Sequence, residues 1–72
     1  MSVIVAIGEA QRVASLAFAG VHVHVAEDAE AIGAAWRALG DDVGVLILTP
    51  FSHAALRSEL DGAARPLSVV MP

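Results

Sequence analysis

The residues of this chain that could do chemistry stand directly after apolar runs. They are Gly8, Glu9, Asp28 and Thr49. If the preceding runs are parallel strands, their carboxyl ends share one edge of a sheet, which is where doubly wound α/β folds bind ligands. The chemistry expected at such an edge is recognition or transfer of a phosphoryl group.

The residue types at this edge argue against phosphoryl transfer. A receiver-type site needs an acidic pair after the first strand, an Asp after the third and a Lys further on, whereas this chain has Glu9, Thr49 and no Lys. Nor is Gly8 part of a glycine-rich phosphate loop. We therefore expect Glu9 and Asp28 to complement helix N-termini. The alternative is a small-molecule or phosphate-sensing module that acts through Gly8, Glu9 and Thr49.

The other reactive side chains also lack a complete site. His22 and His24 lie two residues apart, so on a strand both imidazoles point to one side. Two ligands are too few for a metal ion, and nothing in the sequence places His53 beside them. The chain has no Cys, and none of its serines lies in a G-x-S-x-G elbow. The sequence predicts no catalytic residue, no metal site and no cofactor.

The composition is unusually apolar for a chain of this size. Hydrophobic residues make up 57% of the 72 residues, and the mean hydropathy is +0.71. No run reaches the roughly 18 apolar residues that a membrane-spanning helix needs. A single domain over residues 1–72 can enclose only a small core, so we expect apolar surface to remain exposed.

Charge and cysteine content restrict the partners and the compartment. The formal net charge is −4 and the four arginines are scattered, so nucleic acid and anionic lipid are poor partners. The N-terminus has no basic segment or cleavage site of a secretory signal, and no disulfide can form. These features predict a cytoplasmic protein that does not insert into a membrane.

Strands and helices are expected to alternate along the chain. The expected strands are 3–7, 21–26, 43–48 and 67–71, and the expected helices are 10–19, 29–39 and 50–61. Gly20 stops the first helix, Asp28 caps the second, and Thr49-Pro50 begins the third. Trp36 falls in the apolar stripe of the second helix, so it is expected to pack in the core.

Handedness then predicts the topology of a small doubly wound α/β domain. The first and third strands are continuously apolar and belong in the centre, which gives an all-parallel sheet of order 2-1-3-4. The fold is similar to receiver and flavodoxin domains but shorter. The first helix covers one face, and the other two cover the opposite face.

The face with one helix is expected to leave side chains of the last two strands open to water. The candidate interface residues there are Leu67, Val69 and Met71, or the alternate set with Val70. Phe51 at the start of the third helix caps the sheet or contacts a partner. His22 and His24 form a polar strip on an edge strand and could border the same interface.

Taken in order, the apolar blocks resemble the F subunits of V/A-type (vacuolar and archaeal-type) ATPases. The blocks are V-I-V-A-I-G-E, a helix ending in A-G-V, V-A-E-D-A-E-A, D-V-G-V-L-I-L-T and R-P-L-S-V-V-M-P. Each block alone is unspecific, and their order and spacing over nearly the whole chain carry the resemblance.

The resemblance implies a component of the central rotor stalk that has no active site of its own. Such a component binds the coiled-coil stalk subunit and takes part in coupling or regulating ATP hydrolysis or synthesis with proton or sodium transport. It is cytoplasmic and peripheral to the membrane through its complex. Members of the family continue into a C-terminal helical segment, whereas this sequence ends at Pro72, which leaves the regulatory role of that segment without a counterpart.

An open sheet face or edge allows a third interpretation. The chain could associate with itself, either through the uncovered face or by pairing its fourth strand with that of a second copy. Sedimentation over a wide concentration range distinguishes this from a monomer.

Overall fold

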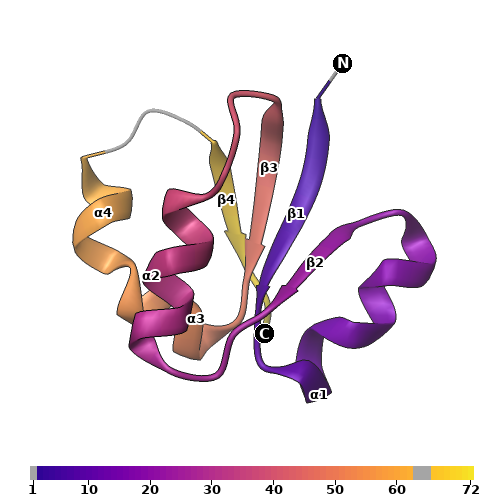
Figure 1. The fold of residues 1–72 in the computed structure, drawn as a ribbon, viewed down its shortest axis with the longest axis horizontal. Helices are drawn as coiled ribbons and strands as arrows, with labels where there is room; N and C mark the ends of the chain where they lie inside the picture. The colour runs from indigo at the N-terminus through magenta and orange to yellow at the C-terminus, as the bar shows by residue number, and fades with distance from the viewer. Residues whose placement is uncertain (1, 63–65) are drawn as a thin grey trace.

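Four parallel strands form one sheet in the order β2-β1-β3-β4 in the computed structural model, which describes residues 2–62 and 66–72 (Figure 1). The strands are β1 (Val3–Gly8), β2 (His22–Val25), β3 (Val43–Leu48) and β4 (Leu67–Val70). All three strand pairs are parallel. The predicted fold class and strand order are therefore confirmed.

The helical segments are shorter and more numerous than predicted. They are α1 (Ala10–Val13), the 3₁₀ helix η1 (Ala14–Ala19), α2 (Ala29–Arg37), α3 (Pro50–Ala55) and α4 (Arg57–Asp61). The first expected helix changes to 3₁₀ after Val13, and the third is divided at Leu56. Val13 and Leu56 are both buried, whereas η1 has no buried residue. Each division lies next to a buried residue, and the single helices predicted for 10–19 and 50–61 are wrong.

The predicted caps explain where these helices begin and end. The Asp28 side chain accepts a hydrogen bond from the Ala31 amide at 2.7 Å. Thr49 caps α3, and Pro50 occupies its first position. Gly20 ends η1 with a φ of +82°, a left-handed conformation that glycine adopts without a Cβ clash.

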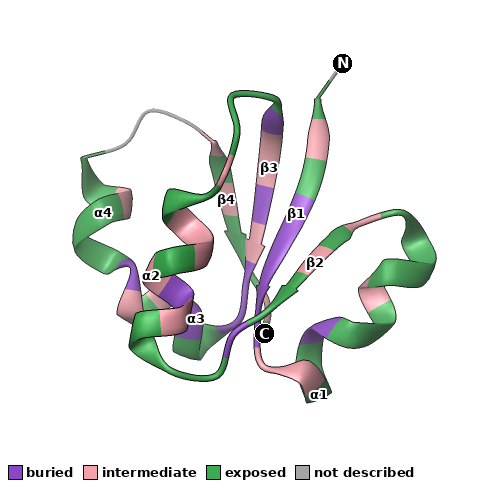
Figure 2. Cartoon of the chain, viewed as in Figure 1, coloured by how far each residue is buried: buried purple, intermediate pink, exposed green. Residues whose placement is uncertain are grey.

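The core lies between the sheet and α2 and α3. Side chains from the central strands and the helices share this layer, among them Val5, Ile7, Leu46, Leu48, Ile32 and Leu56. Figure 2 shows buried residues on the two central strands and exposed residues on the edge strands. Trp36 packs against this core as predicted.

Among residues 2–62 and 66–72, α1 and η1 are the helical segments on the opposite face. Val13 is fully buried, and α1 contacts the end of β1, where Ala6 is also inaccessible. Beyond this point η1 contacts β2, the edge strand. The helical layer on this side therefore covers the β1–β2 side of the sheet and leaves β3 and β4 without a helix over them.

Within residues 2–62 and 66–72, no helix combines the length and hydropathy that a bilayer crossing requires.

Candidate functional site

The candidate functional site is the part of the sheet that no helix covers. Alternation along each strand places on this side the residues that do not point into the core. We call this surface the open sheet face. It consists of Ile4, Val45, Ile47, Leu67, Val69 and Met71.

Exposure on the open sheet face is highest on β4, lower on β1 and lowest on β3, which lies between them. Ile4 is 42% exposed, Val69 49% and Leu67 67%, while Val45, Ile47 and Met71 are half-buried. Strand pairing places Val45 beside Leu67 and Ile47 beside Val69, so the side chains form adjoining rows. An apolar patch of neighbouring side chains usually marks a protein-binding surface.

The six residues of the open sheet face carry no charge, and the charge that the structure places beside its carboxyl end is that of Arg12, which donates to the carbonyl oxygen of Pro72 at 2.6 Å. None of the residues of β1, β3 and β4 is ionisable, and Ser68 is their only hydroxyl-bearing residue. A partner that covers this face would therefore not bury an unpaired charge. The surface is suited to an apolar partner rather than to a charged ligand.

A second group of residues lies at the carboxyl ends of β1 and β3. We call Glu9, Thr49 and Ser52 the polar cluster. The Thr49 hydroxyl donates a hydrogen bond to Glu9 Oε1 at 2.5 Å, and the Ser52 hydroxyl donates to the carbonyl oxygen of Ile7 at 2.8 Å. The amides of Ser52 and Thr49 complete a reciprocal capping box. The polar cluster joins β1, β3 and α3.

The hydrogen bond from Thr49 explains the ionisation of Glu9. The Thr49 hydroxyl stabilises the carboxylate and holds the pKa of Glu9 below its usual range. A backbone hydrogen bond of Glu9 and the charge of Arg12 act in the same direction, and partial desolvation opposes them. Glu9 is thus an anion at neutral pH, which disfavours a second anion beside it.

The polar cluster is closely packed, and its buried polar atoms already have hydrogen-bond partners. Thr49 and Ser52 are fully buried, and a Cβ added at Gly8 would lie 2.5 Å from Thr49 Cγ2. No buried side-chain nitrogen or oxygen in the described part of the chain lacks a hydrogen-bond partner. The arrangement is that of a structural network, and no observation favours the phosphate-sensing alternative. Thermal-shift measurements with nucleotides and phosphoesters test that alternative directly.

Glu9 and Asp28 both stand at helix starts, but their carboxylates have different hydrogen-bond partners. Asp28 caps α2 as expected, but Glu9 makes no side-chain cap of α1. The Ala10 amide instead donates to Glu27 Oε2 at 3.0 Å. Glu9 stands at the N-cap position of α1, where the prediction places it, but its carboxylate accepts from the hydroxyl of Thr49, a residue 40 positions away in the sequence.

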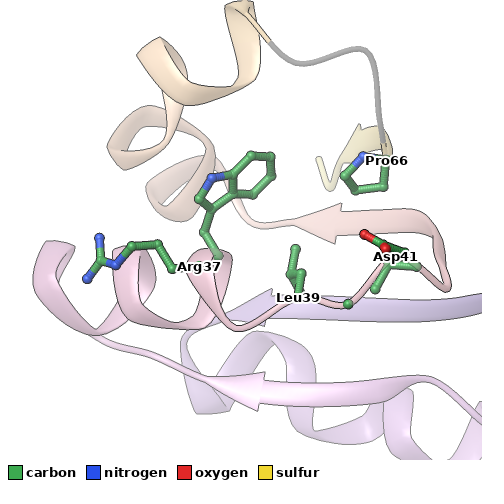
Figure 3. Close-up of a pocket in the computed structure, with 7 residues that line it drawn as sticks. Arg37, Leu39, Asp41 and Pro66 are labelled. Atoms are coloured by element: carbon green, nitrogen blue, oxygen red, sulfur yellow. The ribbon is translucent and has the colours of Figure 1, made fainter.

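Two hollows lie at the amino-terminal side of the sheet. The larger, of about 540 Å³, is lined in part by Trp36, Asp41 and Pro66, and Arg37 on its wall points away from it (Figure 3). The smaller, of about 180 Å³, is lined by His22 and His24 with Leu39 and other residues. No three metal-ligating side chains come together among the residues that the structure describes. Neither hollow has converging charged groups that define a ligand.

The six predicted interface residues do not form one surface. Leu67, Val69 and Met71 share the open sheet face, as expected for the first set of residues. The alternate residue Val70 is paired with Leu48 and lies on the helix-covered side. Phe51 is on α3, which packs in the opposite layer.

The histidines also lie away from the open sheet face. His22 and His24 are exposed on β2, in register with the core residues Val5 and Ile7, so they belong to the side that carries α2. The edge position predicted for their strand is confirmed. The idea that they border the same interface as Leu67 has no support from this placement.

Several residues of the open sheet face and of the polar cluster were not predicted from the sequence. Ile4, Val45 and Ile47 belong to the open sheet face and could have been found by continuing the alternation of Val69 across the predicted strand order. Ser52 follows Thr49 by three residues, the spacing of a capping box. Phe18 is 95% exposed on η1, which a continuous helix over 10–19 did not indicate.

A comparison with protein-family models finds no match for this chain, and a search of curated proteins finds none either.

Proposed function

We propose that this chain is a non-catalytic component of the central rotor stalk of a V/A-type ATPase. It binds the coiled-coil subunit of the stalk through the open sheet face and takes part in coupling or regulating ATP hydrolysis or synthesis with proton or sodium transport. It acts in the cytoplasm, peripheral to the membrane through its complex. The observation that carries the proposal is the uncharged apolar face that this chain leaves exposed.

The ordered sequence blocks are the reason for proposing a V/A-type ATPase as the complex. They span nearly the whole chain, and the strands they predicted form the all-parallel sheet of order 2-1-3-4. The exposed residues Leu67 and Val69 come from the last of these blocks.

The dimensions of the open sheet face suit a helix. Neighbouring strands lie about 4.8 Å apart, so β1, β3 and β4 together present a strip about 10 Å wide. An α-helix with its side chains is about 10–12 Å in diameter. One helix of a coiled coil can therefore lie along this strip and bury Leu67, Val69 and Ile4.

Val69→Asp tests this proposal against Glu9→Ala. An aspartate in the centre of the open sheet face would be buried without a partner, and we expect it to weaken binding of the coiled-coil stalk subunit by roughly 100-fold or more. Glu9→Ala changes the polar cluster and leaves the open sheet face intact, so its expected effect is less than about threefold. Isothermal titration calorimetry of the folded variants measures both.

Two results would count against the proposal. One is an equal effect of the two substitutions, and the other is an unsubstituted chain that does not bind the stalk subunit at micromolar concentrations. Circular dichroism at the titration temperature verifies that both variants remain folded.

A further inference from the structure

The outer edge of β4 is a second unpartnered surface, distinct from the open sheet face. Among residues 2–62 and 66–72, no strand pairs with β4 on the side away from β3. In the part of the chain that the structure describes, β4 makes extensive contact with β3 alone. The backbone groups on this edge are therefore available to another strand.

The direction of these backbone groups follows from one hydrogen bond. The Met71 amide donates to the carbonyl oxygen of Leu48 at 2.8 Å, so it points toward β3. Backbone groups alternate in direction along a strand, which turns the N–H and C=O groups of Ser68 and Val70 away from β3. These two residues present two donors and two acceptors at the outer edge.

Several devices that protect an edge strand are missing from β4. Edge strands are usually protected by being very short or by carrying charged side chains, a proline or a bulge. β4 is short, at four residues, but Leu67–Val70 has neither a charge nor a proline, and its register with β3 is regular. The opposite edge differs, because β2 carries two histidines and lies against η1.

We propose that β4 pairs antiparallel with β4 of a second copy of this chain, about a twofold axis that passes beside Val69. In this register Ser68 of each copy lies opposite Val70 of the other, and each such pair exchanges two backbone hydrogen bonds. The twofold axis makes the contact self-complementary and closed. The inference does not rest on the proposed function, since it uses the edge of the sheet and not its face.

The side chains support the same register. Val69 of one copy lies opposite Val69 of the other at a close, non-hydrogen-bonded position, and Leu67 lies opposite Met71. All are apolar and on the open sheet face, so pairing joins the two faces into one apolar surface. No like charges meet across the axis, because residues 66–72 contain no ionisable side chain.

The contact is small, which limits its strength. A pair of four-residue strands buries much less than the roughly 1,600 Å² of a stable protein–protein interface. We expect a reversible dimer with a Kd on the order of 100 µM.

Ser68→Pro and Ser68→Ala are the matched variants that test the pairing. Proline removes the outward N–H of Ser68 without removing a bond to β3, whereas alanine keeps that N–H. By symmetry the proline variant loses two hydrogen bonds per dimer, so we expect sedimentation equilibrium to show a Kd raised roughly 10- to 30-fold. The alanine variant is expected to dimerise as the unsubstituted chain does.

Hydrogen exchange of the unsubstituted chain provides an independent measurement. The Ser68 and Val70 amides should become protected as the concentration rises through the Kd, while the Met71 amide should be protected at every concentration. The proposal is overturned by a monomer at concentrations about tenfold above that Kd, by a dimer that Ser68→Pro leaves unchanged, or by Ser68 and Val70 amides that exchange equally at all concentrations. Stalk-subunit binding measured at low micromolar concentration, where the chain is monomeric, separates these outcomes from failure of the proposed function.

Discussion

The two faces of the sheet differ in how their apolar residues are used. Leu46 on β3 points into the layer covered by α2 and α3 and is inaccessible to solvent, whereas Leu67 on the neighbouring strand points to the open sheet face and is 67% exposed. Both lie in apolar strands of similar sequence. The comparison shows that hydrophobicity alone does not locate the core of this protein, because the placement of the helices decides which face is covered.

Truncation of one leucine on each face gives the largest expected difference in stability. Leu46→Ala leaves a cavity in the core and should lower the free energy of unfolding by about 2–5 kcal/mol. Leu67→Ala removes an exposed side chain and should cost less than about 1 kcal/mol. Urea denaturation of the two variants measures the difference, and similar costs would mean that the two faces are packed alike.

Gly8→Ala sharpens the comparison where the end of β1 packs tightly against Thr49 and Val13. The new Cβ would lie 2.5 Å from Thr49 Cγ2 and 3.1 Å from Val13 Cγ1, so we expect a loss of about 1–3 kcal/mol. Gly62→Ala is the control, because a Cβ there meets no atom of the described residues within 4 Å. Thermal denaturation should show a lower Tm for Gly8→Ala only, and an unchanged Tm for that variant would contradict the close packing.

The smallest expected effect is a pH dependence of stability from the polar cluster. The folded state holds the pKa of Glu9 below its usual value, so Glu9 contributes stability that is complete above a pH of about 4.5 and is lost as pH falls through the lowered pKa. Glu9→Gln should therefore flatten the dependence of unfolding free energy on pH in this acidic range.

Matched variants at Thr49 identify the cause of this effect. Thr49→Val removes the hydroxyl that donates to Glu9, the largest cause of the lowered pKa, and should remove most of the acidic pH dependence that Glu9→Gln abolishes. Thr49→Ser retains the hydroxyl and should preserve it. If Thr49→Val leaves the pH dependence of stability unchanged in the acidic range, the Thr49 hydroxyl is not the main cause of the lowered Glu9 pKa.

Most of the fold could be predicted from local patterns. The apolar run of β1 indicated a central strand, and Asp28 and Thr49 marked the starts of α2 and α3. Crossover handedness then sufficed for the strand order. These features are determined by residues close together in the sequence, so they could be predicted from the sequence alone.

The site could be predicted only in part, because it depends on contacts between distant segments. The exposure of Leu67 and Val69 followed from the number of helices per face. The capping of α1 by Glu27 and the hydrogen bond between Glu9 and Thr49 join residues 17 and 40 positions apart, and no local pattern signals them.

Thiol labelling tests most directly whether the open sheet face is a docking surface, since the chain has no cysteine of its own. Leu67→Cys places a single thiol on that face, and Glu30→Cys places one on α2 in the opposite layer. With the coiled-coil stalk subunit at about 100 times its Kd, about 1% of the chain is free, so labelling of Leu67→Cys should slow about 100-fold while Glu30→Cys reacts at its original rate. Equal rates at Leu67→Cys with and without the stalk subunit, or protection at Glu30→Cys instead, would contradict the account.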